Sequence, residues 1–145
     1  MTDDEGADGG PFGFPPALAF EFDHLGVATR DAAALADLFG RLLGAPIAHE
    51  EQFEGLDVVF LAVGDCYLEL LEPHESGAVE RFLDERGPGV HHVAFRTSDV
   101  EAALEAAREA GVDLVDEEPR PGARGHDVAF LHPSSTGGVL VEFVE

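Results

Sequence analysis

Residues 22–45, FDHLGVATRDAAALADLFGRLLGA, and residues 90–112, VHHVAFRTSDVEAALEAAREAGV, share one layout. Each begins as a short β-like run with a histidine and passes through an Asp seven residues later. An Ala- and Leu-rich segment follows, and it stops at a glycine. His24 matches His92 and Asp31 matches Asp99 at the same offset of 68 residues. Because a glycine after a helix commonly ends it in the left-handed conformation, the repeat predicts two copies of one supersecondary unit.

Each predicted helix is followed by strand-like runs, at 46–50, 56–63 and 66–72 in the first copy and at 112–116, 127–131 and 138–144 in the second. The unit is therefore βαβββ. Its duplication predicts an α+β fold in which two modules form one curved mixed sheet. We expect a single domain over 20–145, with module one at about 20–74, a linker helix at 76–87 and module two at about 89–145. Residues 1–18, rich in Gly, Pro and acids, are expected to form a disordered tail.

The helical segments carry capping and packing signals. Ser76 is expected to cap the linker helix, and Ser98 with Glu101 is typical of a capping box for the helix of module two. In the helix of module one, the helical spacing predicts a buried stripe made of Leu35, Leu38, Phe39 and Leu42.

The composition is strongly acidic, with 30 Asp and Glu against 8 basic residues, all of them Arg, and a net charge of −22. Such a surface repels phosphate, so nucleic acid and anionic membranes are poor partners. Molar salt shortens the Debye length to about 3 Å and removes self-repulsion, which favours a halophilic source, with genome composition bias as the alternative. The single Cys66, the lack of signal-peptide features and the lack of a bilayer-length apolar run predict a cytoplasmic protein.

The alternation of residues in the first and last strand of each module places one ligand-type side chain per strand on the face away from the helices. Small neighbours, Gly26 and Ala94, leave room on that face for a guest. Two His and two Glu suit a divalent ion such as Co, Mn, Ni or Zn, and an unpaired buried carboxylate would cost several kcal/mol. The alternative is a set of ordinary solvated strand residues. The pattern favours a metal-centred pocket with the ligands His24, Glu69, His92 and Glu142.

The adjacent histidines His91 and His92 point to opposite faces of their strand. His92 aligns with His24 and is the expected ligand. His91 aligns with Asp23 on the packed face, so we expect a structural His91–Asp23 hydrogen bond that is unrelated to the metal.

Several stretches resemble the vicinal oxygen chelate superfamily, which contains glyoxalases, bleomycin resistance proteins and dioxygenases, and within it the methylmalonyl-CoA epimerase family. These are FDHLGVA, LELLEP, GVHHVAF, DEEPRPGARG and FLHPSSTGGVLVE, the last being the most specific. The resemblance runs from about residue 20 to the C-terminus. It implies metal-dependent epimerisation of (2R)- and (2S)-methylmalonyl-CoA by 1,1-proton transfer through a stabilised enolate, in propionate metabolism. It places the metal ligands on His24, Glu69, His92 and Glu142, with Glu69 where many members have Gln.

The resemblance also implies two carboxylates that act as acid and base. Glu142 matches one of them and would double as a metal ligand. The position of the second, a few residues after the hairpin glycine, falls on Val58 when no gap is introduced. Asp57, Glu54 and Glu51 are the neighbouring carboxylates, and the sequence leaves open the choice among them, a water or another group.

Loop residues are the expected contacts of the acyl-CoA, through hydroxyls, backbone N–H groups and two rare positive charges. They are Ser134, Ser135, Thr136, Gly137, Arg120 and Arg124. Ordinary surface ion pairs are the alternative role for the two arginines. The competing functions are a glyoxalase I (lactoylglutathione lyase)-like isomerase and a metal-free binding module of the same fold. Relatives commonly pair as homodimers, which the sequence leaves open.

Overall fold

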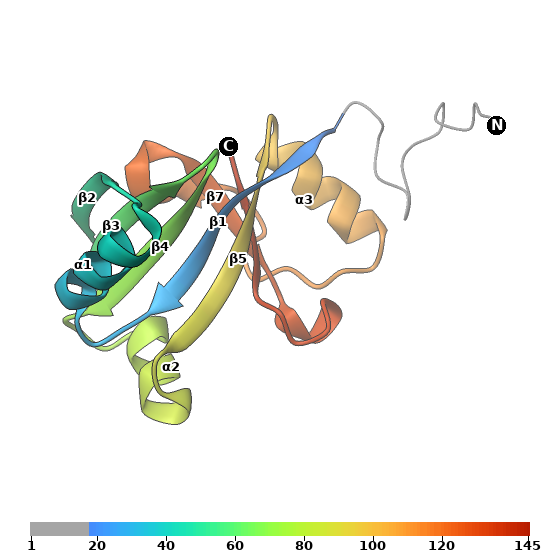
Figure 1. The fold of residues 1–145 in the computed structure, drawn as a ribbon. Helices are drawn as coiled ribbons and strands as arrows, with labels where there is room; N and C mark the ends of the chain where they lie inside the picture. The colour runs from blue at the N-terminus through green and yellow to red at the C-terminus, as the bar shows by residue number, and fades with distance from the viewer. Residues whose placement is uncertain (1–17) are drawn as a thin grey trace. The chain divides into compact units, whose positions relative to one another are not determined.

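The computed structural model describes residues 18–145, which form two compact units: Asp23–Val93, and residues 18–22 together with Ala94–Glu145. Most of the expected tail, residues 1–17, lies outside the described residues. Two long strands, β1 (Phe20–Ala28) and β5 (Gly89–Thr97), run from one unit into the other (Figure 1). Within residues 18–145, no helix has the length and apolar character needed to cross a bilayer.

The unit Asp23–Val93 contains α1 (Ala32–Leu43), β2 (Ile47–Phe53), β3 (Leu56–Val63), β4 (Cys66–Pro73) and α2 (Ala78–Arg86). Its strands are ordered β2-β3-β4-β1-β5. β2, β3 and β4 form an antiparallel meander, and β1 pairs in parallel with β4. This unit therefore contains the predicted βαβββ arrangement of module one.

Helix α1 covers one face of β3 and β4. Its buried residues Ala32 and Ala36 pack with Val59, Leu61 and Leu70, and Leu35 and Phe39 flank this cluster. The predicted stripe is wrong at Leu38 and Leu42, which are 45% and 67% exposed. The small alanines let the helix approach the sheet closely, so the buried face is centred on them and the two leucines turn outward.

The other unit contains α3 (Val100–Glu109), β6 (Arg120–Pro121), β7 (Asp127–Leu131) and β8 (Val141–Val144), with strand order β8-β7-β6. Helix α3 packs its apolar side against Ala129, Leu131 and Phe143. The strand predicted at 112–116 is reduced to one isolated bridge between Leu114 and Leu131. Here the Asp116 carboxylate accepts the N–H of Phe130 at 2.8 Å, so a side chain replaces part of the ladder.

The caps of the helices reproduce the sequence repeat. Asp31 and Asp99 are the N-cap residues of α1 and α3, and each Oδ1 accepts the backbone N–H three residues further on at 3.0 Å. The predicted Ser98 cap is therefore wrong, because Asp99 performs this function. The predicted Ser76 cap is also wrong, since α2 begins after Gly77 with no side-chain cap.

A second pair of contacts is repeated between the last strand of each module and the helix that covers it. Glu72, at the end of β4, accepts the N–H of Ala32 at 2.8 Å. Glu145, just past β8, accepts the N–H of Val100 at 2.9 Å. Each carboxylate lies at the positive end of a helix, where negative charge is favourable. The two modules thus share the same strand-to-helix connection.

Candidate metal centre

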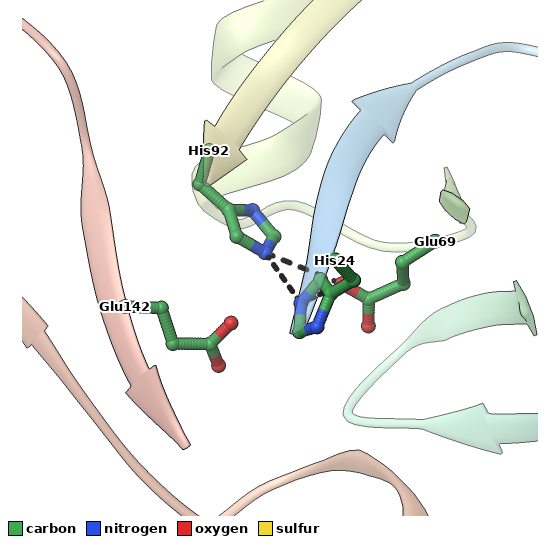
Figure 2. Close-up of side chains that lie close together, drawn as sticks. All are labelled: His24, Glu69, His92 and Glu142. Carbon is green, nitrogen blue, oxygen red and sulfur yellow. Dashed lines mark hydrogen bonds and ion pairs between the residues drawn. The ribbon is translucent and has the colours of Figure 1, made fainter. Parts of the chain in front are cut away.

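Three buried side chains of the unit Asp23–Val93 converge from three strands: His24 from β1, Glu69 from β4 and His92 from β5 (Figure 2). The Nε2 atoms of the two histidines lie 3.2 Å apart. Glu69 Oε1 is 3.1 Å from His24 Nε2 and 3.2 Å from His92 Nε2. The structure therefore brings these three predicted ligands together in a triangle with nearly equal edges.

The strand register explains why these residues share a face. Residues directly opposite each other in neighbouring strands point the same way. Phe60 of β3 is opposite Glu69 of β4, which in turn is opposite Gly26 of β1. His24 lies two residues from Gly26 and so points to the same side. We refer to this side of β1–β4 as the ligand face.

Gly26 is required by the position of His92. A Cβ atom added at residue 26 would overlap the imidazole ring of His92. The expectation that Gly26 leaves room for a guest is therefore not met, because the His92 ring fills that space. Phe60 packs edge-on against His24, with ring centroids 5.6 Å apart, and fixes that ring from the β3 side.

Each histidine is also held through its second ring nitrogen. His24 Nδ1 lies 2.7 Å from Asp23 Oδ2, and both side chains are buried. Because a carboxylate only accepts, Nδ1 of His24 carries a proton, and Nε2 is the ring atom that would bind an ion. His92 Nδ1 lies 3.1 Å from His91 Nδ1, so its Nε2 is likewise the ring nitrogen that faces Glu69.

These contacts change the interpretation of His91. It packs edge-on against Phe82 of α2, at a centroid distance of 5.0 Å, as expected for the packed face. The two histidines were expected to have unrelated tasks, yet the Nδ1 atom of His91 also contacts the His92 ring directly. Asp23, the residue it was expected to bond, contacts His24, and the His91–Asp23 hydrogen bond stays a prediction. His24 and His92 thus each contact the residue that precedes it in the chain.

The charge of Glu69 is fixed by its neighbours. Burial alone would raise the pKa of its carboxyl group, but hydrogen bonds and charge interactions with His24 and His92 outweigh burial and lower the pKa to about 2. The side chain is therefore a carboxylate across the physiological range. Two imidazole nitrogens and one carboxylate oxygen converge on a buried point.

This donor set fits a divalent transition metal. Ligand atoms about 2.1 Å from an ion lie about 3.0 Å apart at right angles and about 3.4 Å apart at tetrahedral angles. The edges of 3.1–3.2 Å fall between these values. Mixed nitrogen and oxygen ligands suit Zn, Co, Ni, Mn or Fe, and the Asp23–His24 pair is the usual second contact of a metal-bound histidine.

Glu142, the fourth predicted ligand, lies buried on β8 of the other unit. It stands opposite Phe130 of β7, just as Glu69 stands opposite Phe60 of β3. The residue after each glutamate, Phe143 or Leu70, belongs to the core beneath the helix of its own module. Glu142 therefore occupies in module two the position that Glu69 occupies in module one.

Neither Asp57 nor Glu54, two of the carboxylates near the expected second base, lies on the ligand face. Asp57 alternates with Val58 and Phe60, so it points to the helix side of β3, where it contacts His74 at 2.7 Å and Gln52 at 3.1 Å. Glu54 lies in the β2–β3 turn, exposed and with φ at 51°.

The loop residues proposed for acyl-CoA contacts lie in the other unit. The Ser135 hydroxyl accepts the N–H of Asp113 at 2.9 Å, and that of Thr136 donates to the carbonyl of Val139 at 2.6 Å. Ser134 is exposed, and Gly137 has φ at 72°. Arg120 contacts Asp116 at 3.0 Å, and Arg124 lies in the short helix Ala123–Gly125 with φ at 62°.

A model of the Glyoxalase/Bleomycin resistance protein/Dioxygenase superfamily matches residues 23–130. The chain belongs to this superfamily. It is 36% identical to the uncharacterized protein YqjC of Bacillus subtilis (strain 168), over 85% of this chain and 90% of that protein. It is 34% identical to the ethylmalonyl-CoA/methylmalonyl-CoA epimerase of Cereibacter sphaeroides, over 83% and 93% of the two chains.

The fold of the chain is also similar to that of a solved structure. A single-residue variant of the Streptomyces coelicolor methylmalonyl-CoA epimerase, in complex with 2-nitronate-propionyl-CoA, matches with a TM-score of 0.82 and 38% identity. The match covers 86% of this chain and 92% of that one. The predicted fold of two βαβββ modules is confirmed.

Sequence reasoning missed two features of this superfamily member. One is the orienting role of Asp23, which the adjacent pair Asp23-His24 could have indicated. The other is a contact on β2, where His49 Nε2 lies 2.5 Å from Glu51 Oε1. The pattern His-x-Glu places both residues on one face of a strand, but which face depends on the β2–β3 register, and the sequence does not state it.

Proposed function

We propose that this protein is a metal-dependent epimerase that interconverts (2R)- and (2S)-methylmalonyl-CoA. The observation that carries the proposal is the buried triangle of two imidazole nitrogens and one carboxylate oxygen. The similarity to methylmalonyl-CoA epimerases over most of the chain supports the substrate.

His24, Glu69 and His92 would hold the ion, and we propose Glu142 as the fourth ligand on the strength of its repeat-equivalent position. The bound ion would stabilise negative charge that develops on the substrate's oxygens. Asp23 and His91 keep the two imidazoles in the orientation and tautomer that ligation needs.

Epimerisation requires a proton to leave one face of the α-carbon and another to arrive on the opposite face. That carbon lies between a thioester and a carboxylate, so its hydrogen is unusually acidic. Glu142 is the proposed proton-transfer group on one face. Its burial keeps water away from the carboxylate during the transfer.

The acyl-CoA is proposed to contact the loop Ser134–Gly137 and the arginines Arg120 and Arg124. Hydrogen bonds join Ser135 of this loop to Asp113 and Thr136 to Val139. Exposed Ser134 offers a hydroxyl, and the guanidinium groups are the rare positive charges on a chain of net charge −22.

The test measures metal content and incorporation of solvent deuterium into methylmalonyl-CoA. The wild type is expected to contain one equivalent of metal and to exchange the α-hydrogen. His92→Ala should lose both, whereas His126→Gln, a change at a histidine of the other unit, should keep both. Turnover of a glutathione hemithioacetal without exchange would assign the glyoxalase I reaction. Equal metal in wild type and His92→Ala would refute the ligand set.

A further inference from the structure

The proposed reaction needs a second proton-transfer group on the ligand face, and β2 provides one. Glu51 of β2 stands directly opposite Val58 of β3, and Val58 stands opposite Leu71 of β4. The neighbouring row, two residues along, contains His49, Phe60 and Glu69 in the same order. Glu51 therefore points to the same side of the sheet as Glu69.

Among strands β1–β4 of the unit Asp23–Val93, Glu51 is the one acidic residue other than Glu69 that the register places on the ligand face. Adjacent strands lie about 4.8 Å apart and same-face residues about 6.7 Å apart along a strand, so the backbones of Glu51 and Glu69 are about 12 Å apart in a flat sheet. That separation is too long for Glu51 to join the ligand triangle. It is compatible with a small acyl group held between the triangle and the Glu51 carboxylate.

His49 holds the carboxylate of Glu51 in place. Its Nε2 lies 2.5 Å from Glu51 Oε1, and its ring also packs against Phe60, with centroids 6.2 Å apart. Phe60 in turn contacts the ring of His24. The Glu51 side chain is only 23% exposed. A short hydrogen bond and an aromatic contact thus connect this carboxylate to the wall of the ligand triangle.

We propose that Glu51 is the second acid–base residue of the epimerase and that His49 is its positioning residue; this inference rests on the proposed function. The Glu51 carboxylate takes the α-hydrogen as a proton, and the electron pair of the broken C–H bond forms the enolate. The electron pair then returns to bond a proton delivered to the other face by the protonated Glu142, which becomes a carboxylate. The reverse sequence converts the opposite epimer.

The position of Glu51 accounts for the apolar Val58. The two residues are cross-strand neighbours on one face. The carboxylate of Glu51 on β2 can therefore replace a carboxylate at residue 58 of β3. Val58 is buried, and its side chain is shorter than that of a glutamate.

The test compares Glu51→Gln with Glu50→Gln, a matched control on the helix side of β2. Glu51→Gln is expected to lower kcat for epimerisation by about 10²–10⁴-fold, the usual contribution of a positioned acid or base, with unchanged metal content. It should still exchange the α-hydrogen of one epimer with deuterium from solvent, through the opposite carboxylate, without inversion. Glu50→Gln should behave as wild type.

Rescue separates a catalytic role from a structural one. Glu51→Gln combined with Val58→Glu should regain epimerisation, because the carboxylate returns to the same face. His49→Gln, which keeps a donor, should retain more kcat than His49→Ala, with little change in KM.

Two results would have different meanings. If wild type neither epimerises nor exchanges methylmalonyl-CoA, the proposed function fails. If wild type epimerises and Glu51→Gln does so equally fast, the assignment of Glu51 fails while the function stands. Loss of activity in Asp57→Asn or Glu54→Gln, with an active Glu51→Gln, would give the role to that residue instead.

Discussion

Asp23→Asn is the most direct test of how the metal centre is held. Asp23 Oδ2 accepts a hydrogen bond from His24 Nδ1 at 2.7 Å, and both side chains are buried. Asparagine has the same shape, but it replaces a carboxylate with a neutral amide. The substitution therefore removes charge from the contact and keeps its volume, so effects of packing are small.

The expected loss can be worked out from this contact. A hydrogen bond to a charged group contributes about 1.5–3 kcal/mol, and about 1.4 kcal/mol corresponds to a factor of ten in affinity. Asp23→Asn should weaken metal binding by about 10- to 100-fold, the range found for orienting partners of metal-bound histidines. The Asp23 carboxylate makes Nε2 of His24 more electron-rich and fixes the tautomer of the ring. The amide introduced by Asp23→Asn would be less effective in both respects.

The assay is titration of metal-free protein with cobalt(II) in competition with a chelator, with the visible spectrum as the signal. Asp31→Asn is the matched control, because it makes the same change at the cap of α1, where Asn is an equally good cap. An Asp23→Asn protein that binds cobalt(II) as tightly as wild type and Asp31→Asn would refute the orienting role of Asp23.

Gly26→Ala should displace the His92 ring, weaken metal binding and lower the free energy of unfolding by about 1–3 kcal/mol. The control Gly40→Ala, whose new Cβ would lie 3.5 Å from the carbonyl oxygen of Ala45, should bind metal normally. Cobalt(II) titration and urea unfolding measure both effects. Asp57→Asn should lower the pKa of His74 in an NMR titration, since the hydrogen bond and charge of Asp57 raise it. The stability that protonated His74 contributes is present below its pKa in the unfolded chain and is lost as pH rises through its folded pKa, so wild type and Asp57→Asn should converge in stability above that pH; a constant difference would contradict the pairing. The unfolding temperature should rise between about 0.1 M and 1 M KCl, because the Debye length falls from about 10 Å to 3 Å and screens the charge of −22; a midpoint that falls with added KCl would contradict a halophilic adaptation.

The repeat made the fold and the convergence of His24, Glu69 and His92 predictable, because the same apolar alternation with one polar side chain per strand occurs twice. The details that failed depended on tertiary contacts. Leu38 and Leu42 follow the helical period, yet the sheet meets the alanine side of α1. The run 112–116 has strand propensity, yet Asp116 bonds the β7 backbone with its side chain. The local sequence pattern does not determine which of two apolar faces of a helix or strand a neighbouring element will cover.

The second base shows a further limit of reasoning along one strand. A catalytic carboxylate is needed at a place in space, and two cross-strand neighbours on one face can both supply it. Glu51 and Val58 are such a pair, seven residues apart in the chain but opposite each other in the β2–β3 hairpin. When this chain is compared with the family pattern without gaps, Val58 stands where a carboxylate is expected. The nearest carboxylate in sequence is then Asp57. The β2–β3 register favours Glu51 instead. Asp57 points to the helix side of β3, where it forms hydrogen bonds with His74 and Gln52. The double variant Glu51→Gln with Val58→Glu tests whether the face of the sheet determines activity. It should be active if a carboxylate on the ligand face is sufficient, whichever of the two strands contains it.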